Sequence, residues 1–420
     1  MKVHPFSEFI SGRTSSSSRM VRKAIAGAGP SVTWSQIHAF RIARHHLDRP
    51  LPRTQVTRAA ADTCGVQAQV MGAAQLALRV RVRGLTIDDV DRALWRTRSL
   101  ARVWCMRGTV HLVPSEDFAI FVRGSSTRQV GLASRWFDRA GVPNAFVDKL
   151  IEAASAAMDR PRTRGEIASR ISDSLGLPIE RGGSRGWGSP VEATGFKLGG
   201  KIVMVPDIAF VATYRGLACF GPDEGEGTTF VRPDAWLPRW RDVPLEEAED
   251  ALLRRYLRAF APATVSDFFA WSRLTMGRAR LIWSRLEEEL SPVTVEGRGA
   301  WILRGDRSAL ERAKTDRRTV RLLPYFDSYL MGHRERGHLV DKAHYSQIYR
   351  PAGWVYPAVL LDGHVAGHWS YERRGKRLQV RVQPHESIPE AIKDLVRVEA
   401  EDVARFLGSL EAHVTFAKAR

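Results

Sequence analysis

The pattern of apolar and polar residues between positions 54 and 114 predicts two helices separated by a short extended break. Residues 56–64 are small and rich in alanine, and Thr54 is suited to cap their N-terminus. Gly65 follows at the C′ position, where a glycine commonly ends a helix. Apolar spacing typical of a helix resumes over residues 71–82, whose end is basic. The residues between the two helices are therefore predicted to be extended.

This break contains two glutamines, Gln67 and Gln69. In an extended chain residues two apart point to the same side, whereas on a helix they diverge by roughly 200°. Both amides are therefore predicted to face one site, with Ala68 turned away. With nine glutamines in the chain, a Gln-x-Gln pair also arises readily by chance. An exposed or hydrogen-bonded loop without a function is the alternative.

A β-hairpin is predicted directly after these helices. Residues 101–106 and 109–113 alternate in apolar character, and Arg107 lies in the turn between them. Because helices followed by a hairpin make a winged helix, residues 31–140 are predicted to form the first such module. Arg107 at the hairpin tip and His111 in its second strand are predicted to contact DNA. For Arg107, a solvated turn residue is the alternative.

The next module is predicted to span residues 141–240, as a second winged helix with a linker. Thr163, followed three residues later by Glu166, has the spacing of a capping box at the start of a helix. Residues 1–30, at the other end of the chain, are rich in Ser, Gly and Arg and are predicted to form a flexible basic arm.

Residues 241–306 have the clearest helix-turn-helix pattern. Three helices are followed by two strands around a Gly-rich tip, as in a third winged helix. Arg278 on the third helix and Arg298 in the wing are predicted to contact DNA. Winged helices also serve as protein-interaction modules, which is the alternative for this copy.

Beyond residue 307 the pattern becomes strand-like, with Asp362 and Gly363 as a turn signal and one helix near the end. A β-rich domain is predicted for residues 307–420. It includes a turn-rich stretch whose basic residues are predicted to face DNA, with a salt-bridged surface loop as the alternative: His333, Arg334 and Arg336. The fold class is therefore α+β, with tandem winged-helix modules around a basic channel and a C-terminal β-rich domain.

The net positive charge of the chain indicates which class of partner it binds. The chain has 64 basic residues against 46 acidic ones, a net charge of +18 and a pI near 10.4, and only ten of the basic residues are lysine. Guanidinium groups pair bidentately with phosphate oxygens, so nucleic acid is the expected partner. The alternative is an Arg-rich composition whose charges are spread evenly. No uncharged apolar run reaches the 18 residues of a membrane span, and no membrane association is expected.

Metal and disulfide chemistry find no support in the sequence. The three cysteines, Cys64, Cys105 and Cys219, are far apart and match neither a disulfide framework nor a C-x-x-C metal site. No metal and no cofactor are expected. Because no apolar segment typical of a secretory signal follows the basic residues in 1–30, and the cysteines fit a reducing compartment, we expect a cytoplasmic protein associated with the nucleoid.

Five segments together resemble a known family. They are CGVQAQ, LWRTRSLARVWCMRGTVHLVPSEDF, RRYLRAFAPATVSDFFAWSRL, LLPYFDSYLMGHRER and GWVYPAVLLDGHVAGHW. In the same order they are similar to the AlkZ and YcaQ-type family of winged-helix DNA glycosylases. The resemblance implies that Gln67 and Gln69 are the catalytic pair, and that the substrate is double-stranded DNA carrying alkylated purines, either bulky N7 lesions or interstrand crosslinks. Glutamine at the second position resembles the branch linked to resistance toward DNA-alkylating natural products.

Glutamine restricts the chemistry that the pair can perform. An amide has no accessible pKa and is no general base, but it can hold a water and aim its carbonyl dipole at developing positive charge. That suffices for an N7-alkylguanine, because this cationic base leaves neutral. No lysine matches a catalytic position, so a monofunctional glycosylase is expected. We also expect a monomer. The alternative is a non-catalytic winged-helix DNA-binding protein, either a transcriptional regulator or a resistance protein that shields lesions.

Overall fold

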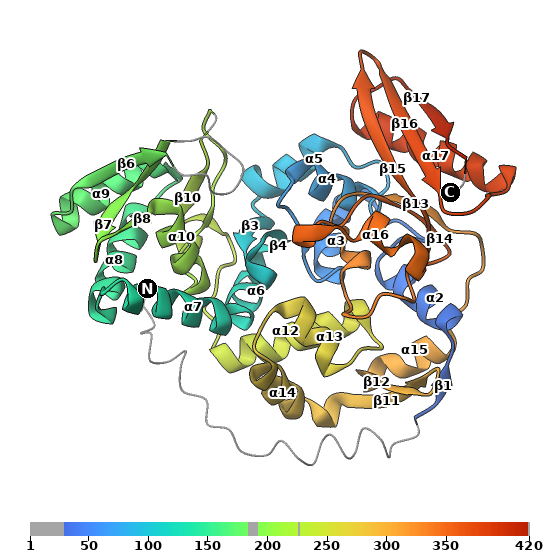
Figure 1. Cartoon of the computed structure of the whole chain (residues 1–420), viewed down its shortest axis with the longest axis horizontal. Coiled ribbons are helices and arrows are strands. Elements are labelled where there is room, and N and C mark those ends of the chain that lie inside the picture. Colours follow the sequence, from blue (N-terminus) through green and yellow to red (C-terminus); the bar gives the residue numbers. More distant parts are fainter. Residues whose placement is uncertain (1–28, 184–191, 226, 419–420) are drawn as a thin grey trace. The chain divides into compact units, whose positions relative to one another are not determined.

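The computed structural model describes residues 29–183, 192–225 and 227–418 of the chain (Figure 1). The basic arm predicted at residues 1–30 lies outside this range except for its last two residues. The described chain contains both helices and strands, and most of its strand pairs are antiparallel, which confirms the α+β class. Among the described residues, no helix has both the length and the apolar character needed to cross a membrane.

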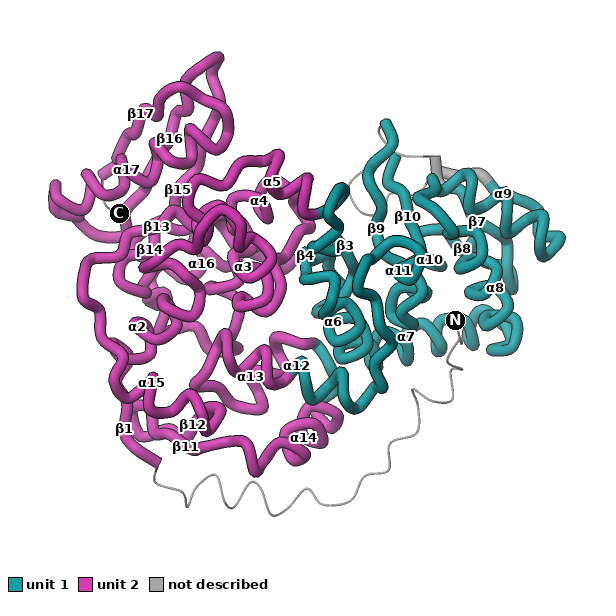
Figure 2. Tube along the Cα trace, turned by 180° about the vertical axis from the view of Figure 1, so that it is seen from behind, with its two compact units in different colours: residues 1–15, 94–252, 273–275 teal, residues 16–93, 253–272, 276–420 magenta. Residues whose placement is uncertain are grey.

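The chain folds into two compact units, each assembled from separate stretches of sequence (Figure 2). Unit 1 contains Leu94–Leu252 and Arg273–Thr275, and unit 2 contains residues 29–93, Leu253–Ser272 and residues 276–418. The modules predicted from the sequence follow the order of the chain, whereas these units do not. The segment boundaries stay predictions about sequence modules, and the two units are described separately below.

Unit 2 begins with β1 (Ser31–Val32) and α2 (Trp34–Arg44). Thr33 caps α2, because its hydroxyl accepts the Gln36 N–H while the Gln36 side chain accepts the Thr33 N–H at 2.9 Å. The chain continues through α3 (Val56–Asp62), β2 (Val66–Gln67), α4 (Met71–Arg79) and α5 (Ile87–Asp91). The predicted break between two helices is therefore present between α3 and α4.

The elements predicted for the third winged helix occur in the expected order. They are α12 (Leu245–Phe260), α13 (Val265–Ser272), α14 (Met276–Arg285), β11 (Leu290–Val295) and β12 (Arg298–Leu303). β11 and β12 form an antiparallel hairpin, and β1 adds to it by pairing parallel with β11. This addition was not predicted, because a strand of two residues has no sequence pattern that indicates a pairing partner more than 250 positions away.

A five-stranded sheet and one helix form the C-terminal part of unit 2. The strands are β13 (Val320–Leu323), β14 (Ala358–Leu361), β15 (His364–Arg374), β16 (Arg377–Pro384) and β17 (Glu411–Phe416), in this order across the sheet. The predicted turn is confirmed, with positive φ at both Asp362 (49°) and Gly363 (94°). Helix α17 (Glu390–Phe406) precedes β17, which pairs parallel with β16 and was not predicted.

One apolar core joins the sheet to the helices at the start of unit 2. Ile42 of α2 and Val80 after α4 pack in the same buried cluster as Leu323, Phe326 and Leu330. The N-terminal helices and the C-terminal β-rich part therefore fold around a shared interior, despite being separated by most of the sequence.

Unit 1 contains a hairpin and a helical region. The hairpin strands are β3 (Leu100–Trp104) and β4 (Val110–Pro114), joined by a turn in which Arg107 has φ 63°. The helices of unit 1 include α6 (Phe118–Gly124), α7 (Ser126–Arg139), α8 (Asn144–Ala157), α9 (Arg164–Leu175) and α10 (Val205–Tyr214). The strands β6 (Ile179–Gly183), β7 (Glu192–Leu198) and β8 (Lys201–Met204) form an antiparallel sheet.

Two local predictions in unit 1 are confirmed. The hairpin turns where the sequence placed it. At the start of α9, the Thr163 hydroxyl accepts the Glu166 N–H, and the Glu166 carboxylate accepts the Thr163 N–H at 2.9 Å, as a capping box requires.

Candidate active site and DNA-binding residues

The chain leaves α3 through a tight left-handed turn. Cys64 has φ 55° and Gly65 has φ 85°. The Cys64 N–H donates to the Ala61 carbonyl at 3.0 Å, and the Gly65 N–H donates to the Ala60 carbonyl at 2.9 Å. These two bonds make a Schellman motif, with Cys64 at C′ and Gly65 at C″. The sequence pattern predicts Gly65 at C′, whereas it occupies C″. The helix ends at Asp62 rather than at Cys64, which moves every cap position towards the N-terminus.

The N-terminal end of α3 also differs from the prediction. A 3-10 turn covers Arg53–Gln55, so Thr54 lies inside that turn, and Gln55 takes the cap position without a side-chain bond. The helix is therefore short, and both of its ends are set by backbone turns.

The two glutamines follow the Schellman turn. Gln67 lies in β2 and is only 6% exposed, Ala68 is 1% exposed, and Gln69 is exposed in the bend before α4. Val70 has extended angles (φ −117°, ψ 106°) and leads into the helix. The pair therefore extends from the interior to the surface, with the buried amide first. That both amides face one site stays a prediction.

Few groups near the pair in the sequence can exchange a proton. Within residues 63–70 the one titratable side chain is Cys64, which is buried. A pair of amides can orient a water and present oxygen dipoles, but it cannot take up a proton at neutral pH. The chemistry available to this segment is therefore electrostatic.

A short 3-10 helix, Ser328–Leu330, contacts the same segment and was not singled out from the sequence as functional. The Ser328 hydroxyl donates to the Gly65 carbonyl at 3.0 Å. The neighbouring Asp327 carboxylate accepts from Arg81, which follows α4. The only sequence signal for these contacts was the position of both residues within LLPYFDSYLMGHRER.

The hairpin turn holds Arg107 beside His111. Arg107 Nη2 donates to His111 Nε2 at 3.0 Å, so Nδ1 carries the proton and donates to the Thr109 carbonyl at 3.0 Å. Burial, reinforced by Arg107, lowers the pKa of His111 to about 3. This imidazole is neutral and 1% exposed, and its contact with DNA stays a prediction. Arg107 is half-buried, and its DNA contact stays a prediction.

The basic stretch near residue 333 is mostly internal. His333 Nε2 faces Arg41 Nη2 at 2.8 Å, and burial, reinforced by Arg41, lowers the pKa of His333 to about 3. His333 is 6% exposed, and its contact with DNA stays a prediction. Arg336 is half-buried over the Tyr349 ring, at 4.4 Å from the ring centroid. Arg334 is exposed and donates to the Ser266 hydroxyl at 3.1 Å. The DNA contacts of Arg334 and Arg336 stay predictions.

The two arginines predicted to contact DNA from the third winged helix differ in exposure. Arg278 on α14 is half-buried, whereas Arg298 at the start of β12 is exposed next to Gly297 at the hairpin tip. Both stay predicted DNA contacts, and Arg298 has the more accessible side chain.

Metal ligands do not gather in the part of the chain that the structure describes. No group of three or more His, Cys, Asp or Glu side chains there is arranged to hold an ion. The cysteines are all buried, and burial raises the pKa of the Cys105 thiol to about 12. Burial also raises the pKa of Cys219, so the Cys105 and Cys219 thiols are protonated at neutral pH.

Comparison with known proteins places the chain in a family. A sequence profile described as DNA glycosylase AlkZ-like matches residues 60–406. An interstrand DNA cross-link repair glycosylase from Streptomyces sahachiroi is 31% identical over 389 residues, which cover 90% of this chain and 97% of that protein. The solved structure of the Streptomyces sahachiroi DNA glycosylase AlkZ has a TM-score of 0.75 and 28% identity, covering 92% of this chain and 100% of that chain. The chain therefore belongs to the AlkZ-like family of DNA glycosylases, hydrolases that cleave N-glycosyl bonds in DNA.

Proposed function

We propose that this DNA glycosylase is monofunctional and hydrolyses the N-glycosyl bond of N7-alkylated purines, including those joined in interstrand crosslinks. The relative from Streptomyces sahachiroi is named for cross-link repair, and this chain matches 97% of its length. In a producer of a DNA-alkylating compound, the same activity would give self-resistance. The protein acts as a monomer in the cytoplasm, on double-stranded DNA.

The observation that carries the proposal is the amide character of the segment between α3 and α4. Gln67 and Gln69 occupy it, and residues 63–70 contain no lysine and no carboxylate. Because this segment supplies no acid to protonate a leaving base, it suits a base that is already a good leaving group. An N7-alkylpurine is cationic, so breaking the bond between C1′ and N9 sends the electron pair onto the base and neutralises it.

The two amides then have complementary roles. As the bond to N9 lengthens, positive charge develops on the sugar, and carbonyl dipoles fixed beforehand stabilise it better than mobile water does. A water held by the amides adds its oxygen to C1′, and its released proton goes to solvent. The products are the free base and an abasic site, because no amine forms a covalent link to the sugar.

The test uses duplexes carrying a single N7-methylguanine or a single N7-linked interstrand crosslink. We expect alkali-labile breaks at the lesion above spontaneous depurination, and no covalent complex after borohydride treatment. A trapped complex would contradict the lysine-free mechanism. Lesion-dependent binding without base release would favour a shielding protein, and a preferred operator with indifference to lesions would favour a regulator.

A second prediction concerns pH. We expect the single-turnover rate on N7-methylguanine to change less than about threefold between roughly pH 6 and 9, because amides do not titrate in this range. His111 and His333, with pKa values lowered to about 3, stay neutral throughout this range. Rates in a series of buffers at constant ionic strength check this. A sigmoidal profile with a midpoint inside the range would indicate a titrating catalytic group.

A third prediction concerns DNA affinity. Arg298→Ala should weaken binding of undamaged duplex by about 3- to 10-fold and reduce the salt dependence by about one phosphate contact, because an exposed arginine contributes one counterion-releasing pair. Arg397→Ala is the matched control, since Glu390 and Asp394 hold that guanidinium at 2.8 and 2.6 Å. Fluorescence anisotropy at several salt concentrations measures both. Equal losses in the two variants would remove Arg298 from the DNA-binding surface.

A further inference from the structure

The short helix Ser328–Leu330 and the residue before it hold the chain on both sides of the glutamine pair. On the N-terminal side, the Ser328 hydroxyl donates to the Gly65 carbonyl at 3.0 Å. On the C-terminal side, Arg81 Nη2 and Nη1 donate to the two oxygens of Asp327 at 2.7 and 2.8 Å. The candidate catalytic residues lie in sequence between these two attachment points.

The Gly65 carbonyl belongs to the peptide that leads directly into β2. Gly65 has φ 85°, which glycine adopts freely, and it follows Cys64, a non-glycine residue whose φ of 55° needs support from its surroundings. The Gly65 N–H is already used by the Schellman bond to Ala60. Ser328, 8% exposed, supplies the bond that fixes the direction of the carbonyl. The orientation of the peptide between Gly65 and Val66 is thereby fixed.

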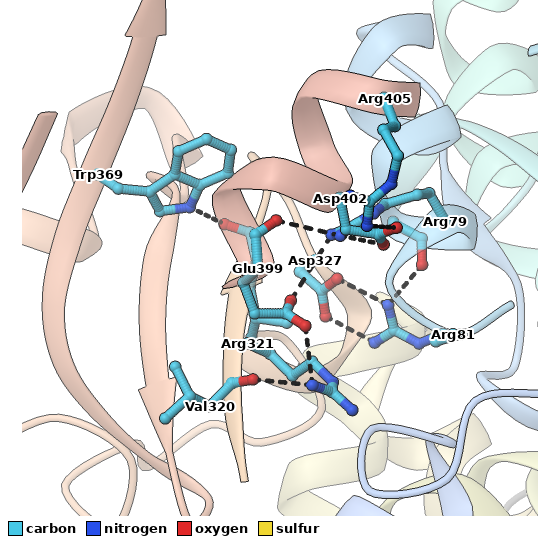
Figure 3. A network of polar contacts seen from close by, with 11 residues as sticks. Arg79, Arg81, Val320, Arg321, Asp327, Trp369, Glu399, Asp402 and Arg405 are labelled. Atoms are coloured by element: carbon cyan, nitrogen blue, oxygen red, sulfur yellow. Dashed lines mark hydrogen bonds and ion pairs between the residues drawn. The ribbon is translucent and has the colours of Figure 1, made fainter. Parts of the chain in front are cut away.

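Asp327 in turn holds Ser328 in place. The Asp327 carboxylate caps the short helix by accepting the Tyr329 N–H at 3.0 Å, and it pairs with Arg81 (Figure 3). The side chains of Arg81 and Asp327 are 1% and 0% exposed. Arg81 Nη1 also donates to the Ala77 carbonyl at 2.7 Å, which ties the pair to the last turns of α4. A buried ion pair joined by two parallel hydrogen bonds leaves both side chains little freedom of movement.

A second set of charges fastens α4 to the C-terminal helix. Arg79, at the end of α4, bonds to Asp402 and to the Glu399 carbonyl of α17. Glu399 also accepts from Arg321 of β13 at 2.8 Å (Figure 3). Helix α4, which begins two residues after Gln69, is therefore anchored at its far end to the β-rich part of unit 2.

We propose that Ser328 is a positioning residue for the glutamine pair and that Asp327 fixes its position, so that the C-terminal β-rich region contributes to the reaction without touching the substrate. The inference rests on the proposed function, in which Gln67 and Gln69 act on the sugar and the water. Dipoles stabilise a transition state only when they are held close to the required geometry, within about 0.5 Å. One hydroxyl that directs the Gly65 carbonyl therefore controls rate more than binding.

The first experiment is Ser328→Ala, which removes one oxygen and leaves the ion pair intact. We expect the single-turnover rate on N7-methylguanine to fall roughly 10-fold, the Kd for the same duplex to stay within about twofold, and the melting temperature to change by less than about 2 °C. Ser328→Thr retains the hydroxyl and should restore the rate to within about threefold of wild type. Ser125→Ala is the control, because that buried hydroxyl also donates to a carbonyl, of Phe121 at 2.7 Å. It should leave rate, affinity and melting temperature unchanged.

A second measurement does not depend on activity. Hydrogen exchange of the peptide covering residues 63–70, followed by mass spectrometry, should be faster in Ser328→Ala than in wild type and unchanged in Ser125→Ala. If wild type releases no base from any N7-alkyl substrate, the proposed function fails, while the exchange result still decides whether Ser328 orders the segment. Unchanged exchange would overturn the positioning role. Faster exchange with an unchanged rate, or a rate lost in proportion to binding and melting temperature, would overturn its importance for catalysis.

Discussion

Gln67→Ala and Gln69→Ala should each lower the single-turnover rate of base release by at least about 100-fold, the usual effect of removing one preorganised dipole from a transition state. Each substitution deletes an amide that would hold water or face the developing charge on the sugar. Binding of the lesion-containing duplex should change by less than about threefold, because an interaction made only in the transition state does not contribute to ground-state affinity.

The measurement is alkali-revealed strand breakage with enzyme in excess over a duplex carrying one N7-methylguanine. Gln75→Ala is the matched control: this glutamine is half-buried on α4, six residues beyond Gln69, and lies outside the break. It should retain the wild-type rate within about twofold. If all three variants release base equally, the catalytic groups lie elsewhere in the chain. If only Gln67→Ala is inactive, the exposed amide serves contact with DNA rather than the reaction.

The double variant distinguishes two ways in which the pair could act. When two groups hold one water, loss of either removes the water, and the second substitution adds little. When each group stabilises separate charge, the two losses add in free energy. We expect the double variant to be slower than the worse single variant by less than about 10-fold, since the glutamines are two residues apart on one short segment.

Local sequence features predicted local structure well. The break between α3 and α4, the Thr163 capping box and the turn at Asp362 were all predictable, because each depends on residues within a few positions of one another. Errors at this scale were small, such as a glycine assigned to C′ that occupies C″. Cys64 and Gly65 both have positive φ here, and the pattern alone could not tell at which residue the helix ends.

The contacts that support the candidate site could not be predicted in the same way. Ser328 and Gly65 are 263 positions apart, and Arg81 and Asp327 are 246 positions apart. A serine and an aspartate in a turn-rich segment are most often read as turn residues, and their role becomes visible only when the short helix meets the end of α3. The burial of single side chains could not be predicted for a related reason: His111 and His333 lie among basic residues in the sequence, but folding buries both.

The buried ion pair should have the largest effect on stability. Asp327→Asn leaves the guanidinium of Arg81, 1% exposed, without a compensating charge. Removing one partner of a buried pair costs about 3–5 kcal/mol, because the remaining charge stays desolvated. Arg81→Met should destabilise to a similar extent by stranding the carboxylate. Urea unfolding followed by tryptophan fluorescence and far-ultraviolet circular dichroism, with coincidence of the two signals as the check on cooperativity, measures the free energy of unfolding.

The combination of Arg81→Met with Asp327→Leu tests whether charge or shape is responsible. Apolar replacement of both partners removes the desolvation cost, so the double variant should be more stable than Asp327→Asn by at least about 1 kcal/mol. Asp394→Asn is the control, since Asp394 and Arg397 are 65% and 44% exposed and exposed pairs contribute little to stability. A double variant as unstable as the single ones would show that the geometry of the pair, rather than its charge balance, holds the short helix. Stability regained without recovery of base release would then separate the folding role of Asp327 from its role in placing Ser328, because an apolar side chain cannot cap the Tyr329 N–H.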